Sequence, residues 1–182
     1  MPERPDLTEA ELLQAALNYI DRYEAPAASL RRVLRRRVRK AVRDGRADPE
    51  HAEAWVEPIV ARFVGEGLVD DARFTEGRRW SARQRGTSAR ALRAKLMGKG
   101  VAQQIIDEAL QAEPEGAEEV AAARYARRRR LGPWRTDGSR SERRMKDLAA
   151  VARAGFPPSI AYNTIDGDRD ELEALIEQAP DD

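Results

Sequence analysis

The sequence contains no cysteine and a single histidine among its 182 residues. Disulfide bonds and zinc sites built from Cys and His are therefore excluded. No run approaches the ~20 consecutive apolar residues of a transmembrane helix, and the polar N-terminus lacks the apolar core of a signal peptide. We therefore expect a soluble, cytoplasmic protein that needs no cofactor or metal ion and has no membrane partner.

Aromatic residues make up only 5% of the chain, and runs in which Val, Ile or Thr alternate with polar residues are missing, so a β-sheet is not expected. Ala, Leu, Arg and Glu dominate instead, and all four favour helix. Hydrophobic residues account for 41% of the chain, which is enough for modest cores under a charged surface. These features predict an all-α fold.

The net charge of +1 conceals a strong separation of charge along the chain. Of the 33 Lys and Arg residues, 28 fall in three windows, at residues 22–46, 78–99 and 124–146, which hold only four of the 32 acidic residues. Such clustering indicates an anionic or acidic partner surface. Three basic windows at similar spacing also suggest an internal repeat.

The first expected repeat covers residues 8–67. Thr8 and Glu11 have the spacing of a capping box, which predicts the start of a first helix. A second helix, after Pro26, carries an apolar stripe with arginines on the opposite side, and Arg37 projects into the stripe. Asp48 is predicted to cap a third helix, in which the interior Pro58 predicts a kink or restart near residues 56–58.

Two further three-helix repeats are expected at residues 68–113 and 114–166, followed by a tail or capping helix at 167–182. Within them, Asp70 and Asp71 can cap one helix, Ser88 can cap a short basic helix that Gly98 and Gly100 stop, and the helix at 141–154 ends before Gly155. Gly100 and Gly155 lie in register, 55 residues apart. We therefore predict an elongated array of three tandem three-helix repeats, with both glycines in a left-handed or otherwise glycine-favoured conformation.

No catalytic constellation emerges from the sequence. His51 is the only imidazole and falls in the first turn of a predicted helix among acidic residues, as expected of a solvated side chain. The segment Gly98-Lys99-Gly100 lacks the spacing of a phosphate-binding loop. The acidic residues from Asp166 to Glu177 lack the glycine that a calcium loop needs at its sixth position. We therefore expect a protein that is not an enzyme.

The basic helix faces remain as the candidate partner-binding site. Trp80 and Tyr125 lie in or beside the basic windows and could stack on nucleic-acid bases, although core packing is favoured for both. The predicted partner-binding residues are Arg32, Arg35, Arg36, Arg39, Arg90, Arg93, Lys99, Arg127 and Arg128.

The middle of the chain resembles the middle repeat of the RecX family, the regulators of the RecA recombinase. The matching residues are Leu68-Val69-Asp70-Asp71-Ala72-Arg73-Phe74, Arg85-Gly86, Leu92, Leu96, Lys99-Gly100-Val101, Ile105 and Ala109-Leu110. The segment Val151 to Ile160, with Gly155-Phe156 inside it, is similar to that family's last repeat, and Arg22 with Ser29 through Leu34 is similar to its opening.

The resemblance implies tandem three-helix repeats in a curved shape that bind in the groove of the RecA filament on DNA and limit its recombinase and ATPase activities. We expect a monomer whose partner is that filament. Direct contact with single- or double-stranded DNA stays open, and the alternative function is a direct DNA-binding helical regulator, such as a helix-turn-helix protein. A protein that binds DNA phosphates should have an affinity for naked DNA that falls steeply as salt rises. A filament regulator should act at protein concentrations at which its binding to naked DNA is negligible.

Overall fold

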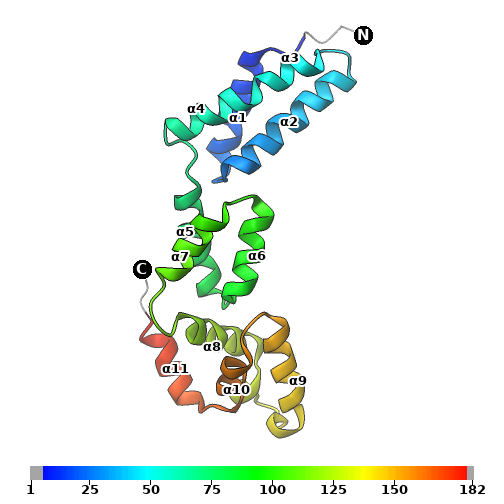
Figure 1. Cartoon of the computed structure of the whole chain (residues 1–182). Coiled ribbons are helices and arrows are strands. Elements are labelled where there is room, and N and C mark those ends of the chain that lie inside the picture. The colour runs from blue at the N-terminus through cyan, green and yellow to red at the C-terminus, as the bar shows by residue number, and fades with distance from the viewer. Residues whose placement is uncertain (1–5, 180–182) are drawn as a thin grey trace. The chain divides into compact units, whose positions relative to one another are not determined.

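The computed structural model describes residues 6–179, and all regular secondary structure in that stretch is helical (Figure 1). This confirms the all-α prediction. None of the helices it contains is long and apolar enough to cross a membrane. The chain divides into two compact units. The first holds the described residues up to Phe74 together with Gly98–Ile105, and the second holds Thr75–Met97 and the described residues from Ile106 onward.

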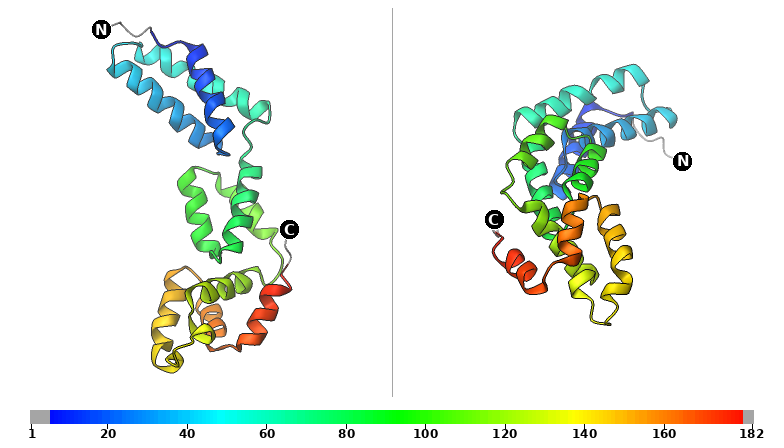
Figure 2. Two further views of the ribbon diagram at one scale, coloured as in Figure 1. Left: turned by 180° about the vertical axis from the view of Figure 1, so that it is seen from behind. Right: turned by 60° about the horizontal axis from the view of Figure 1, so that its bottom comes forward.

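The first unit is built on helix α2 (Ala27–Arg43), against which α1 (Glu9–Arg22), α3 (Pro49–Ala54) and α4 (Val56–Gly65) pack. Both views in Figure 2 show these helices, coloured blue to cyan, as one bundle. Its buried core contains Leu12, Ala16, Leu30, Leu34, Val38, Val56, Ile59, Val60 and Phe63.

The predicted caps and the predicted restart in this unit are confirmed. The Thr8 and Glu11 side chains and backbone N–H groups form the reciprocal capping box at the start of α1. Asp48 accepts a hydrogen bond from the His51 N–H (2.8 Å). The chain restarts between α3 and α4, which places Pro58 in the first turn of α4. N–H groups of a first turn have no partner within the helix, so the proline removes no hydrogen bond there.

The second unit carries α8 (Ala117–Arg129), the short 3-10 helix η1 (Gly132–Trp134), α9 (Arg140–Arg153), α10 (Pro158–Asp166) and α11 (Arg169–Glu177). Helix α8 contacts both α10 and α11. Its buried face consists of small residues, which let its neighbours approach closely: Ala121, Ala122, Ala123 and Ala126. Ile176 of α11 is buried in the same core, so this C-terminal helix is packed against the unit.

Helices α5 (Asp71–Gln84), α6 (Ala89–Lys99) and α7 (Gln103–Gln111) occupy the expected second repeat. The two units divide these residues between them, so the number of repeats stays a prediction. The expected stop at Gly98 is wrong, because α6 continues through it to Lys99. A helix accommodates an isolated glycine at a cost of ~1 kcal/mol relative to alanine.

Gly100 and Gly155 confirm the predicted glycine conformation, with φ of +87° and +98°. Both also pack where no side chain fits. A Cβ on Gly100 would lie 2.4 Å from the Ala28 Cβ, and a Cβ on Gly155 would lie 2.6 Å from the Ser88 Oγ. Each glycine is thus required both by its backbone conformation and by a close approach to the start of a preceding basic helix.

The two glycines belong to a junction that occurs once in each unit. In the first unit Ser29 donates to the Lys99 carbonyl (3.4 Å), and in the second Ser88 donates to the Ala154 carbonyl (2.7 Å). A carboxylate supplements each junction, because Asp71 accepts from the Ala27 N–H (2.8 Å) and Glu118 accepts from the Ala89 N–H (3.0 Å). The junctions fix the N-terminal ends of α2 and α6, the helices that carry predicted site residues.

Candidate functional site

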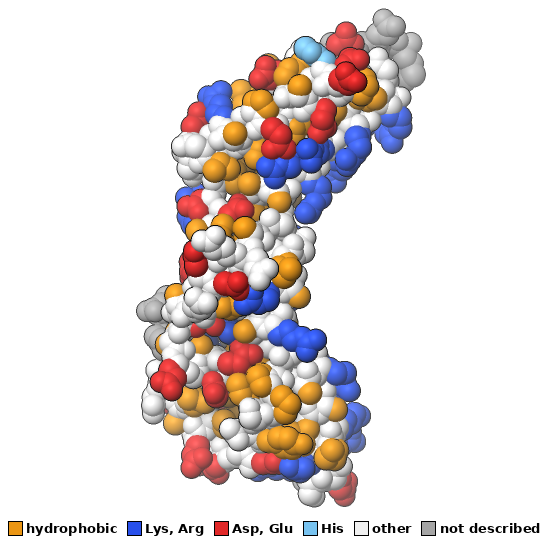
Figure 3. Space-filling model, in the orientation of Figure 1, with side chains coloured by type: hydrophobic (Ala, Val, Ile, Leu, Met, Phe, Trp, Pro, Cys, Tyr) orange, Lys and Arg blue, Asp and Glu red, His pale blue; other side chains and the backbone are white. Residues whose placement is uncertain are grey.

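Helix α2 exposes an uncompensated basic face. Its apolar side, including Leu30, Leu34 and Val38, is buried in the first unit. Within residues 6–179, the exposed arginines on the opposite side form no hydrogen bond or ion pair: Arg32, Arg36 and Arg39. Lys and Arg side chains accordingly line the visible edge of α2 in Figure 3. Because the helix is anchored by its buried side, these three cations remain available to a partner.

Arg35 differs from the other predicted residues on α2. It lies on the flank of the helix and pairs with Glu53 of α3 (2.6 Å) and Glu57 of α4 (3.3 Å). Arg31 also binds Glu57, through two hydrogen bonds of 2.7 and 3.0 Å, and this contact lowers the pKa of the Glu57 carboxyl. The structure therefore corrects the placement of Arg35, which holds α2 against its neighbours, and its role in partner binding stays a prediction.

The basic face of α2 is larger than the sequence pattern indicated. A shallow groove along the helix is lined by Val33, Arg36, Arg37, Arg39, Lys40 and Arg43. Arg37, which the sequence pattern places in the apolar stripe, is exposed, as expected of a side chain that extends from such a stripe into water. It lies at the edge of that stripe, where a long side chain reaches water. Arg37 and Lys40 are therefore members of the face that sequence reasoning left out.

On α6, the three predicted residues fall into two groups. Arg90 and Lys99 are exposed and form no side-chain hydrogen bond or ion pair within the described part of the chain. Arg93 is half-buried and pairs with Asp107 of α7. Arg90 and Lys99 are thus free, like the arginines on the outer side of α2, whereas the Arg93 side chain is engaged in an ion pair within the protein.

Arg127 and Arg128 are both engaged internally. Arg127 pairs with Glu173 of α11 (2.8 Å). Arg128 donates to the Arg85 carbonyl and lies over the Tyr125 ring, 5.9 Å from its centroid. They also lie on α8, which is not the counterpart of α6. The 55-residue offset between the two junction glycines aligns α6 with α9.

Sequence reasoning missed the exposed bases of α9. Arg143, Lys146 and Arg153 are exposed, and none of their side chains forms a hydrogen bond or an ion pair with another described residue. The glycine register was the signal that could have found them, because it points to the helix before Gly155. The basic window at 124–146 hid that signal by spanning the end of α8 and the start of α9.

Two charged side chains of the second unit, Arg83 and Asp147, are buried and compensated by neighbouring groups. Arg83 donates to Glu113 (2.7 and 2.5 Å), to Glu118 (2.5 Å) and to the Thr87 carbonyl (2.9 Å). Burial alone would lower the pKa of the Arg83 guanidinium, but these two carboxylates outweigh it and raise the pKa. This cation, fixed by two carboxylates, holds α5, α8 and the loop before α8 together.

Asp147 forms the second compensated site. It accepts from Arg135 (2.6 and 2.7 Å) and from the Gly132 N–H (2.9 Å). Burial alone would raise the pKa of this carboxyl, but the hydrogen bonds keep the pKa below its ordinary value. This network attaches η1 to α9 and is structural.

The sites considered for chemistry contain no reactive arrangement. His51 is exposed, with its ring edge-on to Trp55 at 4.9 Å. Across residues 6–179, no group of three or more His, Asp or Glu side chains is placed to hold a metal ion. Tyr125 is half-buried and packs against Phe156, as predicted. Trp80 is 48% exposed, so its predicted core position is wrong.

Comparison with known proteins identifies close relatives. The family description "RecX, second three-helix domain" matches residues 70–110. The regulatory protein RecX of Myxococcus xanthus strain DK1622 is 42% identical over 168 residues, which cover 91% of this chain and 90% of that protein. The RecX proteins of Agrobacterium fabrum strain C58 and Thermobifida fusca strain YX are 32% and 35% identical, and their alignments cover 83% and 85% of this chain and 79% and 82% of the respective relatives. No solved structure gives a significant match.

Proposed function

The chain belongs to the RecX family of regulatory proteins, and from this premise we propose that it binds the RecA recombinase filament on DNA and limits the filament's recombinase and ATPase activities. The proposed complex forms in the cytoplasm, where RecA acts, and the protein joins it as a monomer. Regulation by binding requires no reaction, and we assign none.

The observation that carries the proposal is the unpaired basic face of α2. Arg32, Arg36 and Arg39 are exposed and lack an ion partner among residues 6–179, although the same unit provides carboxylates to Arg31 and Arg35. Clustered charges of one sign steer an oppositely charged partner and fix its orientation more than they stabilise a fold. Arg90 and Lys99 of α6 and the three exposed bases of α9 are further candidate contacts.

Direct binding of DNA is the second candidate function, and the spacing on α2 favours it. Residues at i, i+4 and i+7 share one face of a helix, and a rise of about 1.5 Å per residue separates their backbones by about 6 and 4.5 Å. This places several cations in a row against a phosphate backbone. DNA binding of this type is largely independent of sequence and weakens steeply as salt rises.

The test is a titration of RecA filaments, assembled on single-stranded DNA from the recombinase of the same cell, with ATP hydrolysis as the readout. A variant carrying R32E, R36E and R39E is compared with wild type. The matched control carries R22E, R62E and R73E, which changes the net charge equally at exposed arginines on α1, α4 and α5. Circular dichroism verifies that all three proteins have equal helicity.

We expect the α2 variant to inhibit about tenfold less potently, since three exposed contacts of ~0.2–1 kcal/mol each amount to about one factor of ten. The control should stay within about twofold of wild type. Equal potency of the α2 variant and wild type would overturn the assigned surface. Inhibition that occurs only where naked DNA is saturated by the protein would favour the DNA-binding candidate.

A further inference from the structure

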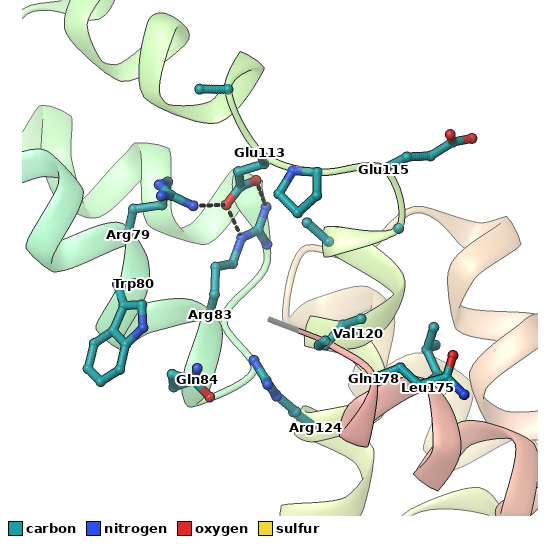
Figure 4. Close-up of a pocket in the computed structure, with 15 residues that line it drawn as sticks. Arg79, Trp80, Arg83, Gln84, Glu113, Glu115, Val120, Arg124, Leu175 and Gln178 are labelled. Atoms are coloured by element: carbon teal, nitrogen blue, oxygen red, sulfur yellow. Dashed lines mark hydrogen bonds and ion pairs between the residues drawn. The ribbon is translucent and has the colours of Figure 1, made fainter. Parts of the chain in front are cut away.

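The second unit contains a pocket that the proposed function does not use. It lies between α5, the loop before α8, α8 itself and the end of α11, and its volume is about 270 Å³ (Figure 4). Every lining residue belongs to the second unit. The pocket is therefore a feature of one compact body, formed in part by the additional C-terminal helix α11.

One side of the pocket is apolar and exposed. Trp80 of α5 is 48% exposed although it is one of only three tryptophans in the chain. Val120 of α8 and Leu175 of α11 are half-buried and lie on the opposite side of the pocket from Trp80 (Figure 4). Exposed tryptophan in a concave site is typical of interface residues that contribute most to binding. The pocket thus offers a place for one apolar side chain of a ligand.

Of the charged side chains that line the pocket, one cation has no ion partner among the described residues. Glu113 is occupied, because it binds Arg83 at 2.5 Å and Arg79 at 3.7 Å. The Glu115 carboxylate points away from the cavity (Figure 4). Arg124 of α8 lines the pocket and is half-buried, and it forms no hydrogen bond or ion pair with any other residue of the described chain. A half-buried guanidinium without a partner favours a carboxylate ligand.

We propose that this pocket binds an acidic peptide segment of a protein partner, with an apolar side chain against Trp80, Val120 and Leu175 and a carboxylate paired with Arg124. Nucleic acid is the alternative that the experiment distinguishes, because a guanidinium without a partner also binds phosphate. The inference goes beyond the proposed function and does not depend on the basic face of α2.

The experiment uses the full chain, labelled with ¹⁵N, and follows the indole N–H signal of Trp80 and the side-chain N–H signal of Arg124 by NMR. The probe is the peptide acetyl-Asp-Glu-Leu-Phe-Glu-amide, and its control is acetyl-Asn-Gln-Leu-Phe-Gln-amide. Trp55, in the first unit, provides an internal reference. We expect saturable shifts of the Trp80 and Arg124 signals with the acidic peptide, and no shift of the Trp55 indole.

Two variants test the assigned contacts. R124Q should weaken the acidic peptide at least fivefold, whereas R129Q, at an exposed position near the end of the same helix, should leave its affinity unchanged. Absence of saturable shifts at millimolar peptide, or equal affinity in wild type and R124Q, would overturn the proposal. Tighter binding of the oligonucleotide dT12 to the same two residues would overturn it in favour of nucleic acid. Shifts that depend on protein concentration without peptide would overturn it in favour of a second copy of the chain.

Discussion

The windows at residues 22–46 and 124–146 each contain ten basic residues, yet the two regions use them differently. On α2, Arg32, Arg36 and Arg39 extend into solvent without partners among the described residues. In the window at 124–146, only some bases, such as Arg143 and Lys146, are free in this way. Its other members include four that bind carboxylates or carbonyls of neighbouring elements: Arg127, Arg135, Arg140 and Arg144. The comparison teaches that the density of basic residues along a sequence does not show how many of them a partner can reach.

The difference arises from where the acidic residues lie. Glu53 and Glu57 of the first unit flank α2 and reach only Arg31 and Arg35. In the second unit, Glu173 of α11, Asp147 of α9 and Asp166 at the end of α10 lie around the basic residues. The second unit therefore uses Arg127, Arg135 and Arg144 to attach its elements to one another, while the arginines on the outer side of α2 remain available for an external contact.

The largest effect is expected at Arg83, the most deeply buried of the internally paired arginines. R83M leaves the Glu113 and Glu118 carboxylates without their main partner in a partly buried place. Loss of one member of a buried ion cluster costs about 3–5 kcal/mol. Chemical denaturation should show this loss, while R85M, at an exposed neighbour, should change stability by less than about 0.5 kcal/mol. A stability of R83M within 1 kcal/mol of wild type would contradict the structural role assigned to the cluster.

The junction glycines should produce the next largest effect, and in both units. G100V and G155V each combine a positive φ with a Cβ closer than 3.0 Å to another residue. We expect losses of about 2–4 kcal/mol in the free energy of unfolding. Gly138 has a φ of +71° but open space around it, so G138A should cost only the ~1–2 kcal/mol of the backbone conformation. If all three variants melt alike, the close approach at the junctions contributes nothing.

Charge reversal compares the two basic regions directly. R32E, R36E and R39E should weaken filament inhibition about tenfold with little change in melting temperature. R127E, R128E and R144E remove contacts to Glu173, Tyr125 and Asp166 and should lower the melting temperature, because each substitution breaks an internal contact of the fold. Thermal melts and ATPase titrations of both variants measure the two effects. The comparison fails if both variants lose potency and stability to the same extent.

Lowering the pH should destabilise the second unit before the first, and we expect this effect to be smaller than those of the substitutions above. Hydrogen bonds from Trp134 and Arg127 lower the pKa of Glu173, and those from Arg135 keep the pKa of Asp147 below its ordinary value. Because both folded values lie below the ordinary values of 4.5 and 3.8, their stabilisation is complete above that range and is lost as the pH falls through it and below. We expect the Trp134 indole signal to report loss of structure at a higher pH than the Trp55 signal, and E173Q to reduce the difference. Coincident transitions would argue against a separate acid sensitivity of the second unit.

Local chemistry made the helix boundaries predictable. Thr8, Asp48 and Ser88 cap helices as their spacing indicated, and Gly100 and Gly155 have the predicted positive φ. These features depend on residues a few positions apart. The 55-residue glycine register also contained the correct alignment of α6 with α9.

The remaining features depend on contacts between residues far apart in the sequence. Arg35 pairs with Glu53 because α3 folds back onto α2, and Arg127 pairs with Glu173, 46 residues later. Trp80 is exposed because its side of α5 lines a pocket that α11 helps to form. No spacing rule gives these pairings, so the sequence could locate the basic clusters but could not show which of their members are free.

Segments of the two units alternate along the sequence, and this order limits how the chain can be divided into fragments. The first unit includes Gly98–Ile105, while the second already begins at Thr75. A single break between these points therefore removes a part of at least one unit, and no pair of complementary fragments contains both units whole. During synthesis, at ~5–20 residues per second, the ribosome must add the Lys99 carbonyl that Ser29 binds before the first unit can complete its junction. A fragment that ends at Ile105 retains the whole first unit and one that begins at Thr75 retains the whole second, so residues 75–105 must be present in both.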